Sequence, residues 1–361
     1  MREEAASVVK RLLVIGYYGF GNFGDELILS GVQAELASLP CAATFAVHNP
    51  RQYAPLLCPR HDLVDRGDAN AMNDAVRRCD AVMLGGGGLV QDASSWRSSL
   101  YYLGIMRWAA LRKRTTISYA QGIGPLTRSW TRRLVRRAFE PMACVDVRDE
   151  ASRALLAECG IDPARVTVSC DVGLTYLINE YAARPALPVQ GPHIAACLNP
   201  RFGWTAQQTA RFLGLLAAPS GATVDLVVLF PDSDFDYTLA VRECLGAPST
   251  LVQAPTAELL AGLCAASRMT VAGRYHMAAA AVAARARTVG LAYDPKLVQL
   301  GASCGFPSIS ASVPPERAAE AALSASMEPA PNAVLSAMKT AGAQRVARLA
   351  AALNMDSNEP A

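Results

Sequence analysis

The sequence lacks any apolar run of the roughly 20 residues that a bilayer-spanning helix needs. The apolar segment after Lys10 and Arg11 is soon interrupted by glycines and acidic residues, so we expect neither a signal peptide nor a membrane anchor there. The ten cysteines include no C-x-x-C pair and no nearby histidine at ligand spacing, which argues against a zinc site and a disulfide framework. We therefore predict a cytoplasmic protein that binds no metal.

Acidic residues are missing from one long stretch. Residues 93–139 contain no Asp or Glu, although the net charge of the whole chain is only +3. The stretch holds ten cations, namely Arg97, Arg107, Arg112, Lys113, Arg114, Arg128, Arg132, Arg133, Arg136 and Arg137. Such a run is either a solvated helix face or a surface that meets an anionic partner, such as a phosphate-bearing substrate or an anionic membrane. Nucleic acid is not expected, because the overall basicity is modest and we find no basic platform interleaved with aromatics.

Apolar runs alternate with helical patterns in two separate blocks. The first block contains "LLVIG", "ATFAV", "CDAVML", "TTISYA", "ACVDVR" and "VTVSC"; after "AARPALPVQGP" the second contains "HIAACL", "TVDLVVLF", "STLVQ", "RMTVA" and "RTVGLAY". This alternation predicts parallel sheets wrapped by helices. We predict an α/β protein of two Rossmann-like domains facing across a cleft, over residues 1–178 and 193–330, with a linker over 179–192. Residues 331–361 are expected to form a helix and a disordered tail, "NMDSNEPA".

A glycine-rich loop follows the first strand, with G-x-G-x-x-G at Gly19, Gly21 and Gly24. Such a turn before a helix N-terminus presents free N–H groups to an anion. A dinucleotide site would also need an acidic residue about 20 positions further on. No Asp or Glu lies between Glu35 and Asp62, so the sequence disfavours a dinucleotide site.

Charged residues at the starts of two predicted helices allow two interpretations each. Asp25 and Glu26 either cap the helix that begins after the glycine loop, or provide a base or a hydroxyl-binding group in the cleft. Arg148 either pairs with the neighbouring Asp149 or Glu150, or holds a carboxylate or phosphate bidentately.

Further candidates come from three other segments. In "VMLGGGGLVQD" and "YAQGIGPL", glycines at strand ends let the backbone approach a ligand closely. In "MTVAGRYHMAAAAVAARA", a strand delivers Gly273, Arg274, Tyr275 and His276 to the start of an alanine-rich helix. A fixed cation, an imidazole and a helix N-terminus together make an anion site with a titratable group beside it.

Five segments together resemble the bacterial polysaccharide pyruvyl transferases, most closely the CsaB type that acts on cell-wall polymers. The segments are "GYYGFGNFGDELIL", "GGGGLVQDASSWRSSLYYLG", "YAQGIGPL", "VRDEASRALLAECGI" and "GRYHMAAAAVAARARTVGLAYDPK". They extend from Gly16 to Lys296, so the resemblance covers most of the chain. The family's donor-binding arginine matches Arg148, and its Arg-Leu-His signature falls on Arg274, Tyr275 and His276, with tyrosine in place of leucine.

The resemblance implies a fold like that of GT-B glycosyltransferases, with phosphoenolpyruvate as donor and neither a metal nor a nucleotide as cofactor. The pyruvyl unit would become a cyclic ketal on the 4- and 6-hydroxyls of N-acetylmannosamine carried on a lipid diphosphate. On this basis we expect Arg148, Gly273, Arg274 and Tyr275 to bind the donor together with His276, which would also act as the acid, while Asp25 or Glu26 would act on the attacking hydroxyl. The expected acceptor-binding residues are Gly21, Asn22, Gly24, Asp25, Gly86, Gly87, Asp92, Arg97 and Gln121.

Stretch 93–139 would then face the lipid diphosphate or the inner face of the cytoplasmic membrane. Two alternatives are a nucleotide-sugar glycosyltransferase of the same fold and a non-catalytic protein that binds anionic glycans. The glycosyltransferase would usually carry an acid for the ribose after Arg274, but none occurs before Tyr293.

Overall fold

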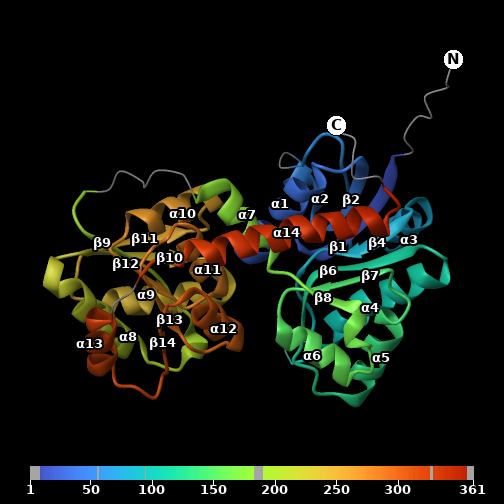
Figure 1. The fold of residues 1–361 in the computed structure, drawn as a ribbon. Helices are drawn as coiled ribbons and strands as arrows, with labels where there is room; N and C mark the ends of the chain where they lie inside the picture. Colours follow the sequence, from blue (N-terminus) through green and yellow to red (C-terminus); the bar gives the residue numbers. More distant parts are fainter. Residues whose placement is uncertain (1–8, 55–56, 94, 183–189, 326–327, 356–361) are drawn as a thin grey trace. The chain divides into compact units, whose positions relative to one another are not determined.

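A computed structural model describes residues 9–54, 57–93, 95–182, 190–325 and 328–355 (Figure 1). Half of the predicted linker (residues 183–189) and most of the predicted disordered tail (residues 356–361) lie outside these ranges. The chain divides into two compact units: the first comprises residues 1–20, 25–175 and 340–361, and the second comprises residues 21–24 and 176–339. Each unit contains a parallel sheet covered by helices, which confirms the predicted α/β class with two Rossmann-like domains.

The first unit is built on an eight-stranded parallel sheet with the order β3-β2-β1-β4-β6-β7-β8, in which β5 pairs with β6. Its strands are β1 (Lys10–Tyr18), β2 (Cys41–Val47), β3 (Asp62–Asp65), β4 (Ala81–Leu84), β5 (Gly87–Val90), β6 (Thr115–Ile123), β7 (Cys144–Val147) and β8 (Val166–Val168). Its helices are α1 (Phe23–Leu36), α2 (Pro50–Tyr53), α3 (Ala69–Arg78), α4 (Trp96–Leu111), α5 (Ser129–Phe139) and α6 (Glu150–Glu158).

Alternate residues of β1 face opposite sides of this sheet, as strand geometry requires. Leu13 and Ile15 join a core with side chains from α3, α4, α5 and α6. Leu12 and Val14 join a second core with side chains from α1 and from the C-terminal helix α14 (Asn332–Ala352). Because both faces are covered, the central strands read as continuous apolar runs.

The second unit holds a six-stranded parallel sheet with the order β11-β10-β9-β12-β13-β14. Its strands are β9 (His193–Cys197), β10 (Thr223–Val228), β11 (Ser249–Gln253), β12 (Met269–Ala272), β13 (Thr288–Leu291) and β14 (Ser308–Ile309). Its helices are α8 (Ala206–Ala217), α9 (Pro231–Cys244), α10 (Ala257–Ala266), α11 (Tyr275–Ala283), α12 (Pro295–Cys304) and α13 (Pro315–Ser324). Helices α1, α7 (Val172–Tyr181) and α14 have residues in both units. Residues 277–283 of the alanine-rich α11 are all buried, which explains the run of small side chains.

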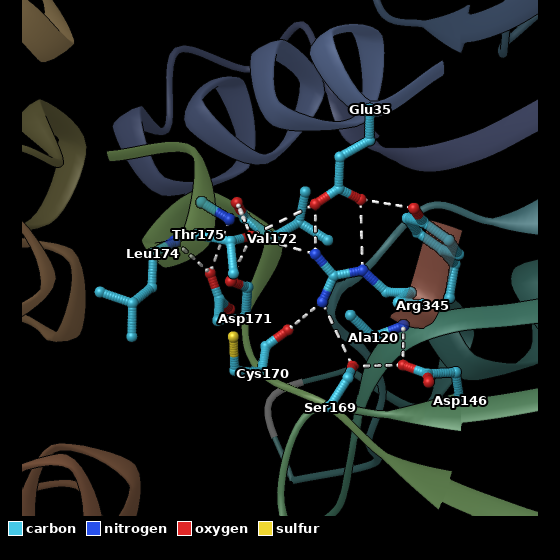
Figure 2. A network of polar contacts seen from close by, with 12 residues as sticks. Glu35, Ala120, Asp146, Ser169, Cys170, Asp171, Val172, Leu174, Thr175 and Arg345 are labelled. Carbon is cyan, nitrogen blue, oxygen red and sulfur yellow. Dashed lines mark hydrogen bonds and ion pairs between the residues drawn. The ribbon is translucent and has the colours of Figure 1, made fainter. Parts of the chain in front are cut away.

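A buried polar network fastens α14 within the first unit (Figure 2). The guanidinium of Arg345 is ion-paired with Glu35 of α1 and donates to the carbonyl oxygen of Cys170 at 2.6 Å and to Thr175 Oγ1 at 3.0 Å. Glu35 also accepts a hydrogen bond from Tyr119 of β6. In the part of the chain that the structure describes, no helix is both long and apolar enough to cross a bilayer.

Candidate functional site

The glycine loop after β1 is held by Glu26. Its carboxylate oxygen Oε1 accepts hydrogen bonds from the Gly19 N–H at 2.9 Å and from the Tyr53 hydroxyl at 3.0 Å. Beside the loop, the Tyr18 hydroxyl donates to the Gly85 carbonyl at 2.8 Å. Burial, followed by the nearby charge of Asp25, raises the pKa of Tyr18 well above its usual value, so this hydroxyl stays protonated. Glu26 thus has a structural task, and its role as a base stays a prediction.

Asp25 lies against the second glycine turn, which joins β4 to β5. Gly86 and Gly87 have φ angles of +91° and +80°, in the left-handed region that favours glycine. A Cβ atom on Gly87 would lie 3.3 Å from Asp25 Oδ1. The amide of Gln121 completes the group, because Nε2 donates to the Gly87 carbonyl at 2.5 Å. The structure therefore brings together Asp25, the 86–87 turn and Gln121, three of the predicted acceptor-side elements.

The side-chain oxygen Oε1 of Gln121 is a candidate contact for a bound molecule. The residue is fully buried, and its Oε1 atom has no hydrogen-bond partner within the described ranges. A buried acceptor without a partner costs about 1–3 kcal/mol, so such an atom usually marks a bound molecule or a functional constraint. A hydroxyl group is a suitable donor to it.

Arg148 follows β7, and its side chain is 6% exposed. Its Nε atom lies 3.2 Å from Asp149 Oδ2, and its Nη1 atom lies 3.4 Å from a carboxylate oxygen of the buried Asp171. Gly122 makes room for the guanidinium, because a Cβ there would lie 2.6 Å from Arg148 Nη2. The pairing with Asp149 was one of the two interpretations of Arg148, whereas no local pattern marked Asp171 as its partner. Donor binding by Arg148 stays a prediction.

Asp92 and Arg97 make other contacts. Asp92 is 2% exposed, and its carboxylate accepts hydrogen bonds from the Thr127 N–H at 2.7 Å, the Thr127 hydroxyl at 2.9 Å and the Arg128 N–H at 2.9 Å. Burial alone would raise the pKa of Asp92, but these hydrogen bonds outweigh it and lower the pKa to about 2. Asp92 therefore fixes the start of α5. Arg97 is exposed on α4, with its guanidinium 5.6 Å from the Trp96 ring centroid.

In the second unit, Arg274 is clamped by acidic and aromatic residues. Its Nε atom donates to Asp234 Oδ2 at 2.9 Å, and its Nη2 atom bonds both Asp234 Oδ1 and, at 2.8 Å, the Ser233 hydroxyl. Its guanidinium also lies 5.6 Å from the Phe230 ring and 6.0 Å from the Tyr293 ring. Burial by itself would lower the pKa of Arg274, but the hydrogen bonds from the guanidinium to Asp234 outweigh it and raise the pKa.

Gly273, Tyr275 and His276 surround this arginine in the chain. A Cβ on Gly273 would lie 2.6 Å from the Cys197 carbonyl oxygen and 3.1 Å from the Asn199 nitrogen, so only glycine fits where β12 passes β9. His276 lies in the first turn of α11, with its ring 5.2 Å from that of Tyr275. Segment 21–24 groups with this unit, and a Cβ on Gly24 would overlap the His276 imidazole.

Sequence reasoning missed several residues of the second unit. Asp234 and Ser233 lie 40 and 41 positions from Arg274, and the acids at the start of α9 were the one available signal. Asn199 was also missed: it is 1% exposed at the end of β9, and its Nδ2 atom has no hydrogen-bond partner among the described residues. Within the same residues, no group of three or more His, Cys, Asp or Glu side chains is placed to hold a metal ion.

Several solved structures share this fold. S. aureus MnaA, solved with UDP, matches with a TM-score of 0.66 and 11% identity, over 98% of this chain and 99% of its own. Anabaena HepE, solved with UDP and glucose, has a TM-score of 0.62 and 14% identity, over 96% and 98%. The Neisseria meningitidis UDP-GlcNAc 2-epimerase has a TM-score of 0.60 and 11% identity, over 94% and 99%. At these identities the likeness shows the fold alone.

The family is identified by sequence similarity to a family model. Residues 22–295 match the polysaccharide pyruvyl transferase family. Because this match covers most of the chain, the protein belongs to that family. No curated protein gives a significant match.

Proposed function

We propose that this protein transfers the pyruvyl group of phosphoenolpyruvate to two hydroxyls of one sugar, forming a cyclic 4,6-ketal and releasing phosphate. The proposed acceptor is N-acetylmannosamine in a lipid-diphosphate-linked precursor of a cell-wall polysaccharide. The observation that carries the proposal is the second-unit cluster at the end of β12, where the clamped guanidinium of Arg274 and the imidazole of His276 lie at the start of α11. A helix N-terminus and a fixed guanidinium suit a carboxylate or a phosphate.

The reaction needs one acid and one group that acts on the acceptor hydroxyl. The first hydroxyl adds to C2 of phosphoenolpyruvate while His276 donates a proton to the C3 methylene, which becomes a methyl group. The second hydroxyl then displaces phosphate from the same carbon and closes the ketal. Overall, one hydroxyl proton ends on the methyl carbon and the other on the released phosphate.

On the acceptor side, Asp25 is the proposed base, because its carboxylate lies beside the glycine turn at residues 86–87, whereas the Glu26 carboxylate accepts hydrogen bonds from the Gly19 N–H and the Tyr53 hydroxyl. Gln121 Oε1 is suited to accept a hydrogen bond from a sugar hydroxyl. Arg148 stays a predicted ligand of the donor.

Incubation of the full chain with phosphoenolpyruvate and a lipid-linked N-acetylmannosaminyl disaccharide tests the proposal. We expect phosphate release and an acceptor that gains the mass of a ketal. His276→Ala should abolish both, while His193→Ala, which removes an imidazole that pairs with Asp225 at the amino end of β9, should retain both. Full activity of His276→Ala would remove this residue as the acid.

A nucleotide-sugar transferase is the second candidate, because MnaA and HepE of the same fold were solved with UDP. It predicts that UDP raises the melting temperature while phosphoenolpyruvate does not. Glycan binding without release of phosphate or nucleotide would instead favour the non-catalytic alternative.

A further inference from the structure

Helices α4 and α5 lie side by side on one face of the first sheet (Figure 1). Their starts meet where the Trp96 and Trp130 rings stand edge to face, with centroids 6.0 Å apart. Further along, Arg107 of α4 donates to the carbonyl oxygen of Arg137 at the end of α5. The two helices therefore run in the same direction and present one continuous surface.

The outer stripe of α4 is apolar where solvent would favour polar residues. Trp96, Leu100 and Leu111 are 40%, 47% and 72% exposed. Their spacing, with Arg107 between them, places all four side chains within about 60° of one another around a helix of 3.6 residues per turn. On α5, Trp130 is 37% exposed, and Arg133 and Arg137 follow it at helical spacing.

The charge of this surface is not balanced locally. Within the described residues, no carboxylate lies in ion-pair distance of Arg97, Arg133 or Arg137. Other cations of the stretch are engaged elsewhere: Arg132 pairs with Glu158, and Arg128 donates to the Asp92 carbonyl. A solvated helix face would account for the arginines but not for the exposed tryptophans and leucines among them.

We propose that the α4–α5 surface, made of Trp96, Arg97, Leu100, Arg107, Trp130, Arg133 and Arg137, docks on an anionic lipid bilayer. Indole rings with an apolar body and one N–H donor favour the boundary between headgroups and acyl chains. Arginines beside them meet the negative surface potential of anionic lipids. The surface does not depend on the proposed reaction, since lipid binding requires neither donor nor acceptor.

Cosedimentation of the full chain with vesicles tests the surface. We expect binding to phosphatidylcholine vesicles that contain 30% phosphatidylglycerol, weaker binding as salt is raised, and little binding to pure phosphatidylcholine. Each arginine near the surface contributes roughly a fivefold change in partitioning, so Arg133→Gln/Arg137→Gln should bind about 30-fold more weakly. The matched control Arg242→Gln/Arg287→Gln, with two exposed arginines of the second unit, should bind as the parent protein does.

The tryptophans give an independent readout. Vesicle binding should shift the indole emission to shorter wavelength, and Trp96→Ala/Trp130→Ala should lose this shift while its melting curve stays close to that of the parent. Equal binding to both vesicle types, no effect of either double variant, or tighter binding to duplex DNA than to the anionic vesicles would overturn the proposal. The two surface double variants should release phosphate with a water-soluble acceptor at the same rate as the parent protein. This assay therefore distinguishes a failure of membrane docking from a failure of the proposed reaction.

Discussion

Substitution of Arg345 tests whether a buried polar network stabilises the first unit. The Arg345 side chain is fully buried, and the Glu35 side chain with which it pairs is 13% exposed. The guanidinium also bonds the Cys170 carbonyl and the hydroxyls of Ser169 and Thr175, so it joins α14 to α1 and to the segment between β8 and α7. Burial would by itself lower the pKa of Arg345, but the charge of Glu35 outweighs it and raises the pKa.

Arg345→Met should destabilise the first unit by about 3–5 kcal/mol, because it leaves a buried carboxylate and several hydrogen-bond acceptors without their partner. For a unit of this size, such a loss lowers the melting temperature by roughly 10 °C. The assay is thermal unfolding followed by circular dichroism, with hydrogen exchange of α1 and α14 to assign the transition, since two-domain chains need not unfold in one step.

Two further variants make the test specific. Arg211 forms an exposed ion pair with Glu316, and Arg211→Met should leave the melting temperature nearly unchanged. The double variant Glu35→Met/Arg345→Met should be less unstable than the sum of its two single variants, because neither charge is then left alone. A loss below about 1 kcal/mol for Arg345→Met, or simple additivity with Glu35→Met, would refute the reasoning.

Two other predictions follow from single contacts. The low pKa of Asp92 contributes stability that is fully present above about pH 4 and is lost as the pH falls through about 2; Asp92→Asn should therefore lose about 2 kcal/mol at neutral pH and show a flatter acid unfolding curve. Equal acid sensitivity of the two proteins would contradict this. Asp234→Asn should raise the KM for phosphoenolpyruvate about tenfold or more, because Arg274 loses a charged, bidentate partner. Steady-state phosphate release measures it, and an unchanged KM would show that the clamp is not needed for the donor.

Local patterns predict most of the strands. Each of the eleven apolar runs falls on a strand, because a strand buried on both faces needs consecutive apolar side chains. Three strands, β3, β5 and β14, are not covered by any of these runs, for physical reasons. Strand β5 contains two glycines and pairs with β6 through its backbone, which needs no apolar side chain. Strands β3 and β14 are short, and the acidic ends of β3 interrupt its pattern.

Side-chain partners could not be predicted in the same way. Arg345 and Glu35 are 310 positions apart, and no local pattern marks either as a partner of the other. Asp25, Gly87 and Gln121 were each found by the rule that ligands gather at the carboxyl ends of parallel strands. Their common location follows from that rule, whereas the unpaired acceptor of Gln121 becomes visible only in three dimensions.

Arg148 and Arg274 show what the sequence alone hides about a predicted anion site. Both were selected as fixed cations, yet each is paired in its own unit with an acid that is 1% exposed, Asp171 or Asp234. The paired carboxylate offsets part of the electrostatic attraction between the guanidinium and an anionic substrate, but it also fixes the position of the guanidinium. The guanidinium still provides N–H donors that are oriented before the substrate binds. Donors oriented in this way stabilise the charge that develops in the transition state more than the charge of the bound substrate. The buried acids are therefore as much a part of the candidate site as the arginines that the sequence pointed to.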